Sequence, residues 1–211
     1  MSWLRQQSIA SFKALNPDWE VVTIGGDWPP GDGWRFDVLR SDYARYADLY
    51  ENGGLYFDTD IIFVKPVPEK WTEAPLVAPI DSTGKIAHIA CLGGTPGHPF
   101  WKMVAARCKL RYQSGVPLDI QAFGTKLLWH TYIHKDMKSI PVEAFLTHPW
   151  DKLELLWSSK PLHIKDWHVG VHWYGGDPLS KDMEKLFWPG NIPECAVATA
   201  LDVTRTDRVA V

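Results

Sequence analysis

The sequence predicts an α/β fold: a single domain with a mostly parallel mixed sheet flanked by helices. Three observations lead to this prediction. The chain has 211 residues, a length that suits one domain with a substantial core. Short hydrophobic segments alternate along it with amphipathic segments, which is the pattern of strands followed by helices. Two carboxylates, Asp58 and Asp60, follow one hydrophobic segment directly, and ligands of open α/β sheets bind at the carboxyl ends of strands.

Composition narrows the classes of function. The net charge is −3, and the basic residues do not cluster, which argues against a nucleic-acid-binding surface. The sequence contains no apolar run of 18 residues and no recognisable signal peptide, so we expect no membrane span. The three cysteines are widely spaced and odd in number, as expected for free thiols in a reducing compartment. Together these features predict a cytoplasmic protein.

The elements of the first 52 residues can be predicted from periodicity and from helix and strand terminators. A helix is expected over residues 3–15, where an Asn-Pro pair ends it. A buried strand is expected over residues 19–24 and a loop rich in glycine and proline over residues 25–33. A second helix is predicted over residues 37–52, and two glycines end it. Its apolar stripe follows helical spacing and comprises Leu39, Tyr43, Tyr46 and Tyr50.

The second predicted helix also carries Asp42 and Arg45, three residues apart and therefore neighbours on the helix surface. One interpretation is a ligand-binding pair. The alternative is an ordinary surface ion pair, worth about 0.3–0.5 kcal/mol.

Asp58 and Asp60 lie in the segment from Gly53 to Val64, whose β-branched and aromatic residues predict a strand. Alternate side chains of a strand point the same way, so both carboxylates could share one cation at the strand's end. Oxygen ligands select Mg²⁺, Mn²⁺ or Ca²⁺, and a cation with few protein ligands completes its shell with substrate phosphates. The pattern therefore indicates a nucleotide diphosphate, with a solvated turn as the alternative interpretation.

Further elements are predicted in the remainder of the chain. Strands are expected over residues 74–79 and 86–91, and helices over residues 97–111 and 126–135. The domain is expected to end near residue 190. Residues 191–211 show no clear amphipathic pattern and are predicted to be a C-terminal tail, or a linker into a further domain of a longer polypeptide.

Several motifs spread over residues 41–66 carry a family resemblance. The chain contains Ser-Asp-Tyr-Ala-Arg-Tyr at residues 41–46, Leu49-Tyr50, Gly-Gly-Leu-Tyr-Phe-Asp-Thr-Asp at residues 53–60, and Lys65-Pro66. This series resembles the sugar-transferase family that carries S-D-x-x-R-Y, L-Y and G-G-x-Y-x-D-x-D. The family includes yeast-type initiating mannosyltransferases, capsular-polysaccharide glycosyltransferases and glucosylating clostridial toxins, and the likeness extends to amino-terminal domains of large algal-virus glycosyltransferases. The resemblance implies a GT-A-like fold, which is Rossmann-like and binds nucleotide sugars. A virus-encoded chain of this kind would work in the host cytoplasm.

The resemblance also implies a reaction. A hexose would move from a nucleotide-diphospho-sugar, with UDP-glucose favoured among UDP-sugars, to a glycan or glycoprotein acceptor with retention of configuration. Mn²⁺ or Mg²⁺ would be the cofactor. The implied metal ligands are Asp58, Asp60 and His172. His172 is chosen because Val-His-Trp matches part of a family phrase, and His168 is the alternative.

The remaining site residues also follow from the resemblance. The implied donor-binding residues are Asp42, Arg45, Asp58 and Thr59. The implied catalytic residues are Asp60 and Arg45, with Asp119 and Gln121 as candidate polar groups near the reacting carbon.

For some residues a structural role is an alternative or is favoured. Asp119 could instead cap a helix, and His98, at the start of a predicted helix, is expected to be structural. The family's first strand, whose I-H-x-x-W motif helps to hold the nucleotide, has no counterpart here. Trp3 is a candidate replacement for its tryptophan.

Two alternatives from other functional classes remain open. In a haloacid-dehalogenase-type phosphotransferase, Asp58 would be the nucleophile and Asp60 the general acid or base, and Asp58 would become covalently phosphorylated. A non-catalytic carbohydrate-binding module is suggested by the 12 tryptophans. Such a module would bind glycan without metal or nucleotide.

Overall fold

The computed structural model describes residues 1–145, 150–160 and 162–206. The described chain forms two compact units, each assembled from separate stretches of sequence. Unit 1 contains residues 1–21 and 58–67 and the described residues from Glu143 onward, and unit 2 contains residues 22–57 and 68–142. Within the described residues, no helix combines the length and hydrophobicity needed to cross a bilayer.

Unit 2 is built on a four-stranded sheet. Its strand order is β1 (Gly54–Phe57), β4 (Cys91–Gly94), β3 (Leu76–Pro79) and β5 (Met137–Ile140). Strand β4 runs antiparallel to both β1 and β3, and β3 pairs with β5 in parallel. The sheet is mixed, as predicted, but the prediction that it is mostly parallel is wrong. The connection from β3 to β4 contains no helix, whereas a parallel neighbour requires a crossover that is usually helical.

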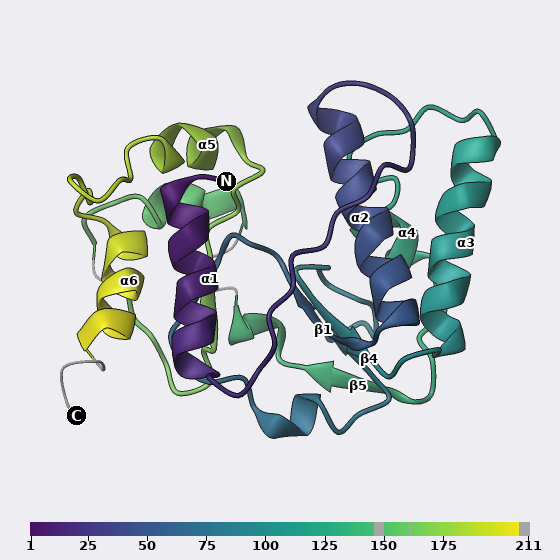
Figure 1. Ribbon diagram of the computed structural model, residues 1–211, viewed down its shortest axis with the longest axis horizontal. Helices are drawn as coiled ribbons and strands as arrows, with labels where there is room; N and C mark the ends of the chain where they lie inside the picture. The colour runs from purple at the N-terminus through teal and green to yellow at the C-terminus, as the bar shows by residue number, and fades with distance from the viewer. Residues whose placement is uncertain (146–149, 161, 207–211) are drawn as a thin grey trace. The chain divides into compact units, whose positions relative to one another are not determined.

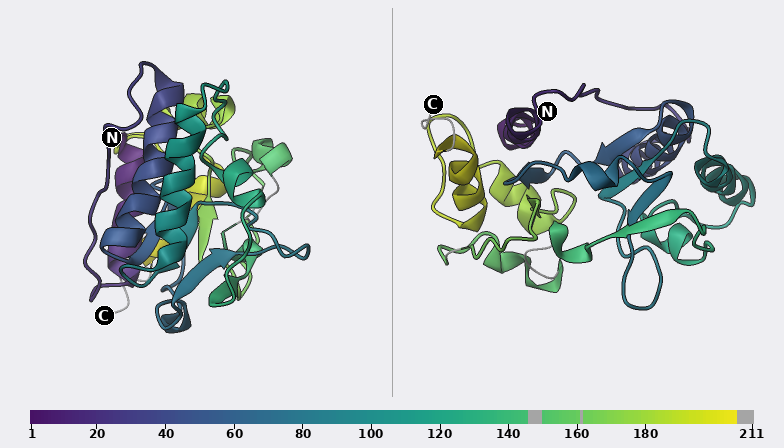
Figure 2. Two further views of the ribbon diagram at one scale, coloured as in Figure 1. Left: turned by 90° about the vertical axis from the view of Figure 1, so that its right-hand side faces the viewer. Right: turned by 90° about the horizontal axis from the view of Figure 1, so that it is seen from below.

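Helices α2 (Trp34–Glu51) and α3 (Pro99–Gln113) run side by side next to this sheet (Figures 1 and 2). The helix predicted over residues 37–52 is thus confirmed, with a start three residues earlier. Its stripe behaves as periodicity predicts, because Leu39 and Tyr46 are fully buried, while Tyr43 and Tyr50 pack at the edge of the core. The unit also contains η1 (Glu69–Trp71) and α4 (Thr125–Trp129), which is shorter than the predicted helix.

Unit 1 contains a two-stranded antiparallel pair, β2 (Ile61–Phe63) and β6 (Gly170–His172), against which α1 (Trp3–Leu15) packs (Figure 2). Two side chains attach α1 to the β2 segment. The Ser11 hydroxyl accepts a hydrogen bond from the Phe63 N–H at 2.9 Å, and the Asn16 side chain accepts one from the Val67 N–H at 2.9 Å. The predicted helix over residues 3–15 is confirmed. The other elements of unit 1 are η3 (Trp150–Leu155), α5 (Pro178–Glu184) and α6 (Ala196–Thr206), and η2 (Val142–Ala144) begins at the last residue of unit 2.

Several sequence predictions need correction. Residues 19–24 form no strand, and their side chains are exposed or half-buried, because this stretch has no strand partner in the described chain. The strand predicted over residues 86–91 begins only at Cys91. The segment predicted to be a tail contains α6, whose buried residues belong to the core of unit 1. The buried residues of α6 are Ala196, Val197, Ala198, Ala200 and Leu201. Three of them are alanines, which differ little in hydrophobicity from their neighbours, so the sequence shows no clear amphipathic pattern. Residues 207–211 of that predicted tail lie outside the described residues.

Candidate functional site

The carboxylates of the D-x-D motif lie next to a histidine in unit 1. One ligand atom each of Asp58, Asp60 and His172 lies within 4.8 Å of the other two. Strand pairing explains this proximity. Ile61, the first residue of β2, is the register partner of His172 on β6, and the Trp173 N–H donates to the Asp60 carbonyl at 3.0 Å. The motif occupies a break between β1 and β2 rather than one continuous strand, so the prediction of a single strand over residues 53–64 is wrong.

Asp60 is buried and surrounded by groups that stabilise its charge. Its Oδ1 atom lies 3.2 Å from His172 Nε2, and its Oδ2 atom accepts a hydrogen bond from the Gly175 N–H at 2.6 Å. Burial by itself would raise the pKa of Asp60, but His172, the Arg5 guanidinium and the Gly175 N–H lower this pKa well below its ordinary value. The carboxylate is therefore ionised at neutral pH.

Arg5 of α1 brings positive charge to the same place. Its Nη1 donates to the Thr59 hydroxyl at 2.9 Å, its Nε is 3.1 Å from a Glu184 carboxylate oxygen, and its guanidinium lies over the Trp173 ring at 5.1 Å. These contacts hold the guanidinium in one orientation. Sequence reasoning missed Arg5, because it is a basic residue of an amphipathic helix outside every recognised motif. Only the packing of α1 against β2 reveals it.

Backbone geometry after β6 places the Gly175 N–H on Asp60. Tyr174 has φ = 53°, the left-handed conformation that non-glycine residues seldom adopt. Its ring stacks on the His172 imidazole with a centroid distance of 4.2 Å. A Cβ atom on Gly175 would collide with the Arg5 guanidinium and the Trp173 ring. Burial, followed by the charge of Asp60, raises the pKa of Tyr174, so its phenol stays protonated.

The cluster has the properties of a site for a hard divalent cation. Adjacent ligands of an octahedral Mg²⁺ ion are about 3 Å apart, close to the 3.2 Å that separates Asp60 Oδ1 from His172 Nε2. Asp60 Oδ1 is buried beside His172 Nε2 on an ionised carboxylate, so both atoms can serve as cation ligands. Two carboxylates with one imidazole suit Mn²⁺ or Mg²⁺. His168, the alternative histidine, lies outside the cluster, and its Nδ1 accepts a hydrogen bond from the Lys165 N–H at 3.2 Å.

Asp42 and Arg45 belong to unit 2, where they form an ion pair with 2.9 Å between Asp42 Oδ1 and Arg45 Nη2. Only 4% and 5% of their side chains are exposed, so the interpretation as a surface ion pair is wrong. Arg45 also donates to the Ile89 carbonyl at 2.8 Å and lies over the Tyr56 ring at 4.5 Å. Burial, followed by the charge of Asp42, raises the pKa of the neighbouring Tyr46.

Asp119 and Gln121, the candidate polar groups near the reacting carbon, also lie in unit 2. A Cβ atom added to Gly124 would be 3.0 Å from Asp42 Oδ2 and 3.1 Å from Gln121 Oε1, so the structure brings Asp42 and Gln121 close together. Asp119 pairs with Lys126 at 2.7 Å, and its Oδ1 accepts a hydrogen bond from the Gln121 N–H. Both residues line a pocket of about 360 Å³ whose walls are Asp81, Ala87, Asp119, Gln121, Thr125, Lys126 and Trp129.

A second pocket of about 360 Å³ lies in unit 2, between residues 23–28 and α2. The carboxylates among its lining residues, Asp27, Asp48 and Glu51, make it a poor place for an anionic nucleotide. Trp3, the candidate replacement for the family tryptophan, packs against the core of unit 1.

Comparison with known proteins adds independent information. Residues 33–77 match the model of the family described as "Glycosyltransferase sugar-binding region containing DXD motif". A human alpha-1,4-N-acetylglucosaminyltransferase is 36% identical over 62 residues, which are 29% of this chain and 16% of that protein. No solved structure matches the chain significantly.

Two longer matches come from Schizosaccharomyces pombe. Inositol phosphoceramide mannosyltransferase 1 is 24% identical over 181 residues, or 81% of this chain and 50% of that protein. Inositol phosphoceramide mannosyltransferase 3 is 22% identical over 177 residues, or 77% of this chain and 49% of that protein. The chain thus spans about half the length of these two relatives.

The matched region contains the Asp42–Arg45 pair and both carboxylates of the D-x-D motif. The resemblance found in the motifs is therefore confirmed for this region: residues 33–77 match the glycosyltransferase family whose sugar-binding region contains a DXD motif, and the similar proteins are named as N-acetylglucosaminyl- and mannosyltransferases.

Proposed function

We propose that this chain transfers a hexose from a nucleotide-diphospho-sugar to a glycan acceptor, with Mn²⁺ or Mg²⁺ held by Asp58, Asp60 and His172. The observation that carries the proposal is the convergence of these ligand atoms within 4.8 Å, although His172 is far from the D-x-D motif in sequence. The family match and the names of the similar proteins support glycosyl transfer. These comparisons favour glycosyl transfer over a haloacid-dehalogenase-type phosphotransferase activity. Covalent phosphorylation of Asp58 would instead support the phosphotransferase.

The chain's own residues prepare the site for a diphosphate. When bound, the cation would neutralise negative charge that builds up on the leaving diphosphate. Asp60 is kept ionised by His172, Arg5 and the Gly175 N–H and would ligate the cation directly. Asp58 would contact the cation's shell or the donor ribose. Arg5, fixed by its contacts with Thr59 and Glu184, would add a positive charge beside the diphosphate oxygens.

In unit 2, Asp42 and Gln121 would hydrogen-bond sugar hydroxyls. Arg45 would act as a positioning residue, because its guanidinium holds Asp42 and is itself fixed by the Ile89 carbonyl. The pocket that Gln121 shares with Asp119 and Trp129 combines an aromatic side chain with polar groups. This combination is suited to a sugar ring, whose faces are apolar and whose rim is polar.

The identity of the donor is a finer part of the proposal. UDP-glucose is the favoured donor. GDP-mannose is the first competitor, because the two longest matches are named mannosyltransferases. Transfer with retention is proposed from the family resemblance, with the acceptor entering on the face that the phosphate leaves. NMR analysis of the product made from a donor of known anomer tests this point, and an inverted product would contradict it.

The decisive experiment is calorimetric titration of UDP, UDP-glucose and GDP-mannose with and without Mn²⁺. Two carboxylates and one histidine leave the cation short of ligands, so Mn²⁺ should bind weakly alone and tightly with the diphosphate. By linkage, donor and metal must tighten each other's binding by the same factor. Asp60→Asn should abolish this coupling. The matched control is Asp182→Asn, which alters an exposed carboxylate of unit 1 paired with Lys185 and should leave the coupling unchanged.

Two results would contradict the proposal. One is nucleotide binding by the wild type that does not depend on metal. The other is full coupling in Asp60→Asn. If GDP-mannose binds with metal and UDP-glucose does not, the donor preference is wrong and the metal site stands.

A further inference from the structure

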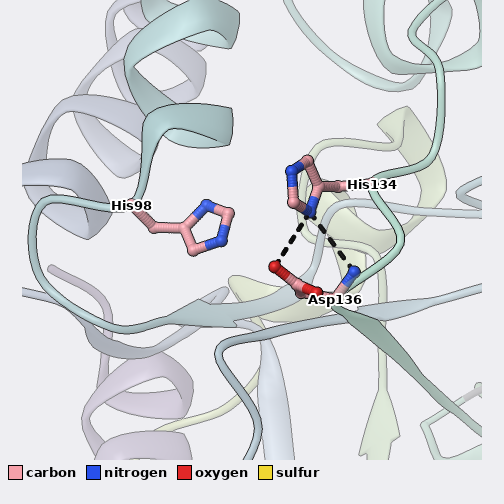
Figure 3. A group of neighbouring side chains, drawn as sticks. All are labelled: His98, His134 and Asp136. Atoms are coloured by element: carbon pink, nitrogen blue, oxygen red, sulfur yellow. Dashed lines mark hydrogen bonds and ion pairs between the residues drawn. The ribbon is translucent and has the colours of Figure 1, made fainter.

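A second group of potential metal ligands lies in unit 2, outside the D-x-D site. One ligand atom each of His98, His134 and Asp136 lies within 4.8 Å of the other two. His98 precedes the first residue of α3, and Asp136 precedes the first residue of β5. Figure 3 shows the His98 and His134 side chains extending toward one another, with the Asp136 carboxylate beside both. Their centroids are 5.0 Å apart and the rings are perpendicular.

The role of His98 at the helix start accounts for only part of this arrangement. Its Nδ1 accepts a hydrogen bond from the Phe100 N–H at 3.2 Å and so caps α3, as expected for a structural histidine. That bond leaves Nε2 as the ring nitrogen that can bind a ligand.

His134 and Asp136 supply the other two groups. His134 Nδ1 lies 3.5 Å from Asp136 Oδ2 and accepts a hydrogen bond from the Asp136 N–H at 3.3 Å. Their side chains are 34% and 42% exposed. Solvent and a dissolved cation can therefore reach the group, and both side chains have room to rotate.

We propose that His98, His134 and Asp136 form a binding site for a divalent transition-metal ion of the zinc type. Two imidazoles and one carboxylate are a ligand set that Zn²⁺ favours, whereas Mg²⁺ and Mn²⁺ prefer sites made mainly of oxygen. Ligands of one tetrahedral zinc ion are about 3.4 Å apart. The ligand atoms lie within 4.8 Å of one another, so the widest separation would have to shorten by up to about 1.4 Å, which the partly exposed side chains of His134 and Asp136 can supply.

The site would join two parts of unit 2 that are distant in sequence. His98 begins α3, whose Phe100, Trp101 and Val104 belong to the core, while Asp136 leads into β5, which pairs with β3. A bound ion would close the chain between residues 98 and 136 and stabilise unit 2, because an ion that binds only the folded state shifts the unfolding equilibrium. Water would complete the coordination on the exposed side.

Titration of the full chain with ZnCl₂ tests this site. The experiment uses Asp60→Asn as its background, so that Zn²⁺ binding at the D-x-D cluster is weakened. In this background we expect one site, and adding His134→Ala or Asp136→Asn should weaken binding about tenfold or more. The control is His130→Ala, which removes an exposed histidine of the same segment that lies outside the group. His98 is left intact because it caps α3.

Thermal unfolding with and without Zn²⁺ gives a second measurement. Zn²⁺ should raise the unfolding midpoint of the background and of the His130→Ala variant, but not of the His134→Ala variant. Circular dichroism of each variant in chelator verifies that the variant is folded. Undiminished Zn²⁺ affinity after His134→Ala and Asp136→Asn, or an equal loss after His130→Ala, would overturn the proposal.

Discussion

Replacing Asp42 by Asn tests the contribution of the buried ion pair of α2. The change preserves size but removes the negative charge, so the Arg45 guanidinium, 2.9 Å away and 5% exposed, loses its charged partner. Removing one member of a buried pair costs about 3–5 kcal/mol. Arg45 keeps its hydrogen bond to the Ile89 carbonyl, and we therefore expect the lower end of this range, about 3 kcal/mol. Urea unfolding followed by circular dichroism measures the loss as a lower midpoint with an unchanged slope.

The same helix offers a matched control. Asp37 and Arg40 form an ion pair with the same spacing and the same 2.9 Å distance, but the Asp37 side chain is 70% exposed. Asp37→Asn should therefore cost only about 0.2–1 kcal/mol. The double variant Asp42→Asn with Arg45→Met should recover part of the loss, because no unpaired charge remains buried. Equal destabilisation by Asp42→Asn and Asp37→Asn would refute the reasoning.

Three further predictions follow from unit 1. Gly175→Ala should weaken metal-dependent nucleotide binding in calorimetry, because the added Cβ would displace the Arg5 guanidinium. Gly176→Ala is the control and should leave binding unchanged, because a Cβ at this position meets no atom within 4 Å. Equal effects of the two substitutions would contradict this prediction. The lowered pKa of Asp60 means that the unfolded chain binds the proton more readily, so wild-type stability should fall as pH drops below about 4. Urea unfolding at several pH values should show a smaller decrease in the free energy of unfolding at low pH for Asp60→Asn than for the wild type. Identical pH profiles of the two proteins would contradict this prediction. Leu201→Ala in α6 should cost about 2–5 kcal/mol in urea unfolding, because this side chain is 2% exposed, whereas no loss would support the tail interpretation.

Some features of this protein are encoded locally and could be predicted from sequence. The apolar stripe of α2 recurs at helical spacing, and the two glycines after it adopt positive φ and end the helix. A histidine followed by proline marks the start of α3, where the ring caps the first turn. The D-x-D motif and the Asp42–Arg45 spacing indicate the family resemblance, because these patterns span few residues, and both lie in the region that matches the family model.

Strand direction and sheet membership depend on partners that are distant in sequence. Strands of three or four residues carry too little alternation to distinguish parallel from antiparallel pairing, which is why the prediction that the mixed sheet is mostly parallel was wrong. Residues 19–24 have the composition of a strand, yet no strand among the described residues pairs with them. The alanines of α6 do not stand out in sequence, and only the packed core of unit 1 shows that they are buried.

The candidate site likewise combines residues that could be predicted from sequence with features that only the tertiary structure reveals. Asp58 and Asp60 were found from their spacing and His172 from a family phrase, but only the pairing of β2 with β6 brings them together. Arg5 has no local signature, and Asp42 and Arg45 have the spacing of any surface pair. The strength of a charge interaction depends on burial and on neighbours from other segments. Tertiary structure alone therefore decided that Arg5 lies beside the D-x-D motif and that the ion pair of α2 is buried.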